Sequence, residues 1–261
     1  MPMRPGDRLI LAVLAIIIVL TALDAATGGA IAGRANAHLA GWAQALGGWL
    51  MRIGLFISPV LLLPLLTALM GRFLSVPAGA WNFERSLIGI LDRITLTIGG
   101  AARWFALGLV VATAVIVIQR YVFGYASTKL QESVIYMHAL LFLLASASAL
   151  LNGGHVRVDV IYEKLDERGK AWTDLIGTYL ALMPMSFLIL WSSTGYMNST
   201  WRILEQSRES DGLPFVFLLK TAIPVFAVMM ILQGFSMAAR AAMTIGRETP
   251  PPLPDTFKGE V

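Results

Sequence analysis

The segment LILAVLAIIIVLTAL, residues 9–23, contains one polar side chain, the hydroxyl of Thr21, and no charged residue. A helix that is apolar on every side is buried in a large core or in a membrane. Similar runs recur along the chain, as in FVFLLKTAIPVFAVMMILQGFSM at residues 215–237. Each is close to the ~20 residues that a helix needs to cross a hydrocarbon core. These blocks predict a chain folded within a membrane.

The composition of the whole chain agrees with this prediction. Of the 261 residues, 57% are hydrophobic and only 14% are charged, and the mean hydropathy is +0.71. Soluble domains have roughly 25% charged residues, because their surface must meet water. We therefore expect an all-α membrane protein in which little of the chain forms a soluble domain.

The apolar blocks predict six membrane-spanning helices. The predicted spans are residues 9–31, 46–70, 104–118, 130–151, 175–198 and 215–237. After the last span the sequence TPPPLP at residues 249–254 predicts an extended, solvated tail over residues 246–261, because proline-rich segments do not continue a helix.

The first span has two interpretations. Arg4 and Arg8 precede the apolar run, and Ala30-Ile31-Ala32 offers a small-x-small pattern, which together are typical of a cleaved signal peptide. The apolar stretch, however, continues past Asp24, which favours a retained helix. We expect a retained helix with Asp24 near its outer end, followed by an interfacial turn at residues 27–29.

A weaker, mixed segment separates the second and third predicted spans. The apolar residues of this segment recur at helical spacing, whereas its charged residues lie elsewhere around the helix, which predicts an amphipathic helix on the membrane surface. The break at residues 77–79 divides the chain into a two-helix extension, residues 1–80, and a four-helix core, residues 81–245. The apolar positions are Leu87, Ile90, Leu91, Ile94 and Ile98, and the charged ones are Arg85, Asp92 and Arg93.

Local signals predict details within these helices. Pro59 and Pro64 each lack a backbone N–H, so we expect a kink in the second span. Thr128, with Gln131 three residues later, fits a capping box at the start of the fourth span. Gly153-Gly154 fits the end of that span, since glycine readily takes the left-handed conformation that closes a helix.

The distribution of basic residues predicts the orientation. If the N-terminus faces the cytoplasm, thirteen of the 20 Lys and Arg residues fall in cytoplasmic segments, which are the N-terminus and residues 71–103, 152–174 and 240–261. The remaining seven lie in or beside the opposite loops. The positive-inside rule therefore predicts that both termini are cytoplasmic.

Several function classes are excluded by absent residues and motifs. The chain has no cysteine and only three histidines, which argues against disulfides, thiolate chemistry and a histidine-rich metal site. It contains no GxGxxG, no GxxxxGK[ST], no HExxH and no GxSxG. Despite a pI of about 9.6, no basic face interleaved with aromatic residues predicts nucleic-acid binding. We expect no enzyme activity and no cofactor.

Ionisable residues inside predicted spans are costly in lipid and are therefore candidates for function. Glu132 and His138 lie in the fourth span but are six residues apart, so they point to different faces and do not form a proton relay. Each is expected to meet a partner helix or the interface. The densest polar stretch, NGGHVRVDVIY at residues 152–162, predicts either a solvated loop or a fixed junction between helices.

A series of short motifs over residues 90–240 resembles the small, DctQ-type membrane subunit of tripartite ATP-independent periplasmic (TRAP) transporters. GHVRVD at residues 154–159 is the most specific part of this resemblance. It is accompanied, in chain order, by RYVFG at residues 120–124, Gln131-Glu132, Glu205-Gln206-Ser207, Gly212-Leu213-Pro214, Lys220, Pro224 and Leu232-Gln233.

The resemblance implies a four-helix core in the bacterial inner membrane with both termini cytoplasmic. It also implies a large membrane subunit that carries the substrate and sodium sites, and a periplasmic binding protein that delivers a small solute, typically a carboxylate. This chain would buttress the large subunit and contact membrane lipid. A stand-alone secondary carrier is the alternative, but the clear repeat halves and midplane charges expected of one are lacking.

The resemblance implies structural or interface roles for eleven residues and catalysis for none. They are Arg120, Glu132, Gly154, His155, Arg157, Asp159, Glu205, Gly212, Pro214, Lys220 and Pro224. The two N-terminal spans depart from the four-helix pattern of the family, and they would enlarge the scaffold, contact the large subunit or bind lipid.

Overall fold

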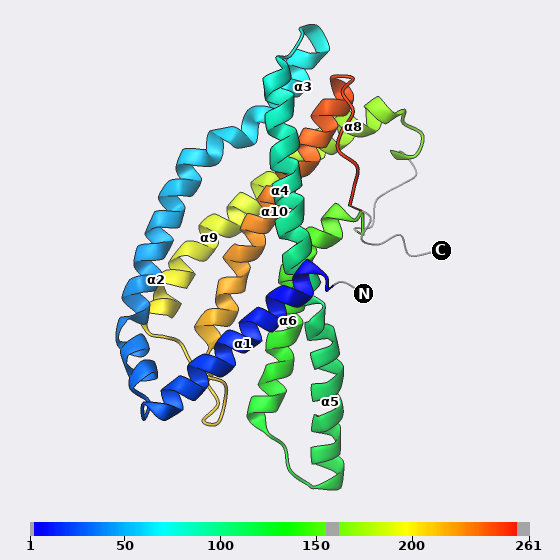
Figure 1. Ribbon diagram of the computed structural model, residues 1–261. Coiled ribbons are helices and arrows are strands. Elements are labelled where there is room, and N and C mark those ends of the chain that lie inside the picture. Colours follow the sequence, from blue (N-terminus) through cyan, green and yellow to red (C-terminus); the bar gives the residue numbers. More distant parts are fainter. Residues whose placement is uncertain (1–2, 155–161, 255–261) are drawn as a thin grey trace. The chain divides into compact units, whose positions relative to one another are not determined.

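A computed structural model describes residues 3–154 and 162–254, and the regular elements within these ranges are helices (Figure 1). In chain order they are α1 (Pro5–Ala26), α2 (Ala30–Ile57), a 3₁₀ turn η1 (Ser58–Leu62), α3 (Leu63–Phe73), α4 (Ala78–Ala102), α5 (Trp104–Val122), α6 (Thr128–Leu151), α8 (Glu167–Gly177), a π-helical turn η2 (Thr178–Leu182), α9 (Met183–Arg202) and α10 (Val216–Ile245).

Among the described residues, six helical stretches are long and apolar enough to cross a membrane, which agrees with the predicted all-α membrane fold. The mean hydropathy of their most apolar parts lies between 1.7 and 2.8, yet at most 39% of any of these parts is buried within the chain. Apolar side chains therefore face outwards, an arrangement suited to lipid. The stretches are Pro5–Ala26, Ala30–Phe73, Ala78–Val122, Thr128–Leu151, Glu167–Arg202 and Val216–Ile245.

The boundaries of the first two stretches differ from the prediction. Helix α1 ends at Ala26, and Gly28 and Gly29 form the turn with φ of +65° and +84°. Helix α2 begins at once at Ala30, so residues 32–45, predicted as a loop, are helical. This segment is rich in alanine, the residue with the highest helix propensity. Hydropathy does not detect such a helix, because alanine is only weakly hydrophobic. Asp24 lies near the end of α1, as expected, and it also holds the turn by accepting a hydrogen bond from the Ala32 N–H at 2.8 Å.

The predicted proline kink is present as the 3₁₀ turn η1 between α2 and α3. Pro59 cannot donate to the Leu55 carbonyl, and the Ser58 hydroxyl donates to that carbonyl instead, at 2.8 Å. A neighbouring side chain thus satisfies a carbonyl that the proline leaves open.

The ends of α6 correct one prediction and confirm another. Ser127, rather than Thr128, lies at the N-cap, and its hydroxyl accepts from a backbone N–H of the first turn at 3.4 Å. Both residues favour caps, so the sequence could not choose between them. At the other end Gly153 has φ +68°, and the Gly154 N–H donates to the Ala149 carbonyl at 2.8 Å.

Contacts divide the chain into two compact units. Unit 1 comprises Met1–Ile53, Thr97–Ala145 and Ser192–Val225, and unit 2 comprises Gly54–Leu96, Ser146–Trp191 and Phe226–Val261.

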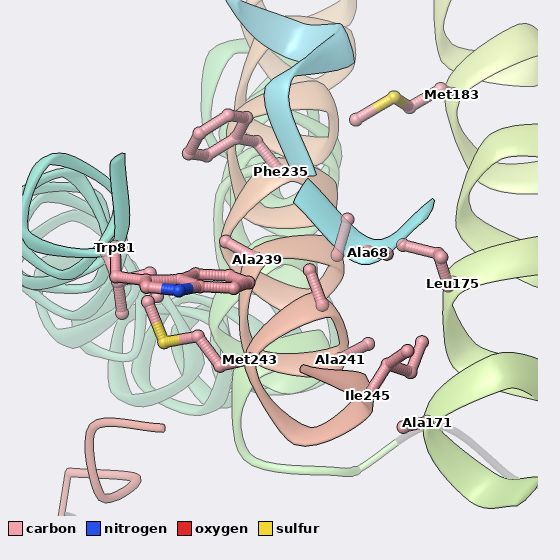
Figure 2. Packing of buried hydrophobic residues seen from close by; sticks show 13 residues of the cluster. Ala68, Trp81, Ala171, Leu175, Met183, Phe235, Ala239, Ala241, Met243 and Ile245 are labelled. Carbon is pink, nitrogen blue, oxygen red and sulfur yellow. The ribbon is translucent and has the colours of Figure 1, made fainter. Parts of the chain in front are cut away.

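The core of unit 2 is built around the small residues of α10. Four alanines of this helix, at positions 238, 239, 241 and 242, are buried, and they let neighbouring helices approach closely. Figure 2 shows Trp81 of α4 lying beside Met243 and Ala239, with Leu175 of α8 on another side of α10. A Cβ atom at Gly246 would come within 2.9 Å of the Trp81 ring, so this contact requires glycine.

The face of α4 that is buried within the protein is its polar one. Ile90 and Ile94, assigned to its apolar face, are 56% and 42% exposed. The buried face instead carries two carboxylates, Glu84 and Asp92, together with Trp81, Ile88 and Thr95. In lipid the apolar face of a helix is stable outside, so the polar face turns inward, where it finds partners.

Both buried carboxylates of α4 accept hydrogen bonds, although one oxygen of Glu84 is buried with no hydrogen-bond partner among the described residues. Asp92 forms an ion pair with Arg240 of α10 and accepts a hydrogen bond from Ser236 at 2.7 Å. The Asp92 and Arg240 side chains are only 6% and 13% exposed. Glu84 accepts from the Thr67 hydroxyl of α3 at 2.8 Å. The carboxylates thus join α4 to α10 and α3 inside unit 2.

In unit 1 the start of α1 docks against the junction of α4 and α5. Gly6 is the only buried residue of α1, and a Cβ atom there would lie 2.4 Å from the Gly100 carbonyl carbon. Asp7 forms an ion pair with Arg103 and accepts from the Trp104 indole N–H at 2.9 Å. Most of the rest of α1 is exposed, so this contact holds its N-terminal end.

We predict that Asp92→Asn destabilises the chain strongly, because Arg240 would keep a buried charge without its counter-ion. The expected loss is about 3 kcal/mol, the usual cost of breaking a buried pair. Thermal unfolding in detergent, followed by circular dichroism, measures it.

The matched control is Asp211→Asn, which breaks the Lys129–Asp211 pair, whose side chains are 55% and 63% exposed. The expected loss there is below ~1 kcal/mol. Equal melting temperatures for the two variants would contradict the structural role of the buried pair.

Candidate functional site

The loop between α9 and α10, residues 203–215, is the point where predicted site residues meet in unit 1. Glu205, Gly212 and Pro214 belong to this loop, Glu132 reaches it from α6, and Lys220 reaches it from α10. We call it the α9–α10 loop.

Glu132 fastens the α9–α10 loop to the first turns of α6. One carboxylate oxygen accepts from the Ser207 hydroxyl, and the other accepts from the Leu213 N–H at 2.6 Å. Hydrogen bonds to an ionised carboxylate are shorter and stronger than neutral ones. One side chain therefore holds both arms of the loop, which the Ser207 N–H also joins by donating to the Leu213 carbonyl at 3.2 Å.

Gly212 allows the loop to approach Glu132 this closely. A Cβ atom at position 212 would lie 2.3 Å from the Ser207 hydroxyl oxygen and 2.8 Å from a Glu132 carboxylate oxygen. Both distances are below any that real Cβ atoms show, so any other residue would push these two groups apart. The glycine is required by space rather than by a positive φ.

Glu205 joins the end of α9 to the start of α10. Its carboxylate pairs with the Lys220 ammonium at 2.5 Å and accepts from the Thr200 hydroxyl at 3.0 Å. The Lys220 ammonium also lies 4.3 Å from the centre of the Tyr196 ring, a cation–π distance. The hydrogen bond from Lys220, followed by that from Thr200, holds the pKa of Glu205 below its usual value of 4.5 despite partial burial. Glu205 is therefore ionised at neutral pH.

Leu204 shows that the local contacts determine the conformation of this loop. It has φ +47°, a left-handed conformation that costs a non-glycine residue roughly 1–2 kcal/mol. The conformation closes α9, because the Glu205 N–H can then donate to the Thr200 carbonyl at 3.1 Å. Such strain persists only where surrounding interactions over-determine it.

Three further predicted residues, Arg120, Gly154 and Pro224, take no part in the contacts just described. Arg120 is exposed in the last turn of α5 and makes no ion pair with a residue that the structure describes. Gly154 follows α6, and Pro224 lies inside α10. Three others, His155, Arg157 and Asp159, fall outside the described residues. Their interface roles stay a prediction.

Sequence reasoning missed the polar network of unit 2. It placed Asp92 on the outward side of a surface helix, and it assigned no role to Glu84 or Arg240. The spacing of buried residues at 81, 84, 88, 92 and 95 is a regular helical face, so the signal was present. This signal can be recognised only if a membrane helix is expected to turn its polar side into the protein.

The described residues include no group of three or more His, Asp or Glu side chains that could hold a metal ion. The polar groups of the site instead pair with one another across helix ends. This arrangement fixes the positions of α6, α9 and α10 where they meet the α9–α10 loop. Its contribution is to hold these helix ends in place.

The helices and their outward apolar surfaces define a multi-pass membrane protein. The family model described as tripartite ATP-independent periplasmic transporters, DctQ component, matches residues 109–244. That match covers more than half of the chain, which therefore belongs to the DctQ family of TRAP transporter subunits and confirms the resemblance seen in its motifs. Comparisons with curated proteins and with solved structures gave no match.

We predict that Gly212→Ala loosens the α9–α10 loop, because the added methyl group displaces Glu132 from Ser207. Trypsin should then cut after the exposed Arg208 about tenfold faster under native conditions, equivalent to about 1.4 kcal/mol of lost local stability.

Gly195→Ala is the matched control, since Gly195 lies in the same unit and a Cβ there meets nothing within 4 Å. Its cleavage rate should equal that of the unmodified chain. An unchanged rate in Gly212→Ala would show that Gly212 does not maintain the loop.

Proposed function

We propose that this chain is the small permease subunit of a sodium-gradient-driven TRAP transporter in a bacterial inner membrane. In this proposal it buttresses a large permease subunit, and a periplasmic binding protein delivers the solute, a small carboxylate. Membership of the DctQ family is the observation that carries the proposal. It implies no catalytic step for this chain.

The way the chain pairs its buried and partly buried charges supports a scaffold role. Asp92 is paired with Arg240, Glu205 with Lys220, and Glu132 holds a loop through two donors. A transport site needs charges that exchange partners as a solute enters and leaves. These carboxylates are instead occupied by the chain itself, in contacts that join helices.

The outward surfaces supply room for a partner subunit. Helix α5 has one buried residue, Ala112, and large apolar side chains such as Val110 and Ile118 are more than half exposed. In a membrane such a face packs against lipid or against another helix. A subunit that supports a larger one needs a lateral surface of this kind.

We also propose that residues 81–245 form the four-helix core of the family, preceded by the extension over residues 1–80 and followed by the tail over residues 246–261. The family match at residues 109–244 supports this division, because it lies wholly within the proposed core.

The proposal predicts that the chain co-purifies with a large permease and that uptake needs both chains. The two subunits would be co-expressed from neighbouring genes, reconstituted in liposomes and supplied with the binding protein and labelled carboxylates. Uptake should require an inward sodium gradient and disappear when potassium replaces sodium. Strong uptake by this chain alone would contradict the proposal and favour a stand-alone carrier.

The proposal also places both termini in the cytoplasm, on the strength of the basic residues. The chain has no cysteine, so single cysteines report orientation without background. Ser210→Cys in the α9–α10 loop should react with a membrane-impermeant maleimide in intact spheroplasts, and Thr249→Cys only after permeabilisation. The reverse pattern would overturn the orientation and leave the family assignment intact.

A further inference from the structure

We propose that Glu84 is a proton-binding site: in the folded chain at neutral pH it is a neutral carboxylic acid that donates a hydrogen bond to the Thr67 hydroxyl. Glu84 lies on α4, in the spanning stretch Ala78–Val122, and Thr67 lies on α3, in the stretch Ala30–Phe73. Both residues belong to unit 2, whereas the α9–α10 loop belongs to unit 1. The site has no part in the proposed transporter function, so the two can be tested separately.

The carboxyl group of Glu84 is enclosed by the protein. Glu84 is 0% exposed, and Thr67 is 3% exposed. One carboxyl oxygen lies 2.8 Å from the Thr67 hydroxyl oxygen. The other oxygen is also buried, and it has no hydrogen-bond partner among the described residues. Buried ionised carboxylates are normally paired with a cation or surrounded by several donors. Glu84 has a single hydroxyl.

The charge of an ionised Glu84 would also lack a counter-ion, because Glu84 forms no ion pair within the described part of the chain. The charged and titratable side chains of the helices around this core bind other partners. Arg240 pairs with Asp92 and Arg85 with Glu248, the Arg168 guanidinium donates to the Ile245 carbonyl, the Tyr179 hydroxyl donates to the Leu61 carbonyl, and Asp174 accepts from the Tyr162 hydroxyl. Arg72 of α3 is exposed and lies over the Phe73 ring.

The two protonation states of Glu84 differ in what they leave unsatisfied. An ionised Glu84 would be a buried charge with no counter-ion, which is among the most costly defects in a protein interior. A protonated Glu84 carries no charge, and its only deficit is one neutral oxygen without a donor, which costs much less. Carboxyl groups in apolar sites do stay neutral at neutral pH and act as hydrogen-bond donors. Burial of this group therefore favours the neutral acid.

Thr67 is arranged to accept a hydrogen bond from this acid. Its hydroxyl oxygen also lies 3.1 Å from the Leu63 carbonyl oxygen, one turn back along α3, and 3.2 Å from the Pro64 carbonyl oxygen. Threonine hydroxyls within helices commonly donate to such carbonyls. A hydroxyl has one proton and two lone pairs, so a Thr67 that donates to Leu63 can accept from Glu84. The 2.8 Å separation of the two side-chain oxygens fits donation in either direction.

The bound proton lets α3 and α4 be joined without a charge. About two turns further along α4, Asp92 is also buried, but there the Arg240 guanidinium supplies a counter-ion. Helix α4 thus carries two buried carboxyl groups in different states. Asp92 is ionised and paired, whereas Glu84 is neutral and donates to Thr67. The neutral hydrogen bond connects the second spanning stretch of the chain to the third, inside unit 2.

The test is infrared spectroscopy of the full chain in mild detergent at neutral pH. The C=O stretch of a protonated carboxyl group lies above the amide I band, whereas ionised carboxylates absorb below it. The spectrum of the unmodified chain minus that of Glu84→Gln should show one band of the protonated kind. Glu248→Gln is the matched control, because it makes the same substitution in the same unit at a carboxylate that is paired with Arg85. Its difference spectrum should show a carboxylate band instead.

Thr67→Val tests the hydrogen-bond partner. The protonated band should remain in this variant and move to higher wavenumber, because the acid has lost its acceptor. An unshifted band would show that Glu84 does not donate to Thr67. A carboxylate band in the difference spectrum of Glu84→Gln would overturn the proposal as a whole.

Melting temperature supplies a second readout. Glu84→Gln should melt no lower than the unmodified chain, because a glutamine amide is neutral and can also donate to Thr67. Glu84→Ala leaves a cavity and should melt about 5 °C lower. A glutamine variant that melts as low as the alanine variant would contradict a neutral Glu84, since it would show that the carboxylate charge is required.

Discussion

A polar group within a membrane must find its partner inside the protein, since hydrocarbon offers none. In unit 2 this requirement fixes how α4 meets its neighbours. Asp92 meets Arg240 and Ser236 of α10, and Glu84 meets Thr67 of α3. Each contact spans a long separation along the chain, 148 residues in the case of Asp92 and Arg240. Closing these pairs determines which face of α4 is turned inward, and the alanines of α10 then allow the helices to approach.

The same requirement at a helix end produces a different structure. Glu132 and Glu205 lie near the ends of α6 and α9, where backbone N–H groups and hydroxyls are available. They therefore bind loop groups, and the α9–α10 loop becomes a fixed part of unit 1. Leu204 has a strained backbone conformation there, and position 212 requires glycine, which has no side chain. Because the loop keeps a strained residue and a required glycine, we infer that its fixed conformation is what matters for the protein.

Hydropathy predicts the spans because the length of a membrane helix follows from bilayer thickness. It failed at residues 32–45, where alanine forms a helix without strong hydrophobicity. Periodicity identified the apolar face of α4, which the structure leaves exposed, but it could not show that Asp92 turns into the protein rather than towards water. The structure brings together Glu132, Glu205, Gly212 and Lys220, four of the residues that the motifs named, and their interface roles stay a prediction. The contacts of these residues could not be predicted from the sequence, because Ser207 and Glu132 are 75 residues apart and only the fold brings them together.

The two N-terminal helices are packed less closely than the helices of the core. They make few buried contacts, and the strongest is at one end, where Gly6 and Asp7 meet Gly100, Arg103 and Trp104. A membrane helix gains nothing by hiding apolar surface from lipid that is equally apolar, so it associates through small residues and polar contacts. Helix α2 carries many alanines and glycines but buries none of its residues, so this chain does not use them for close packing.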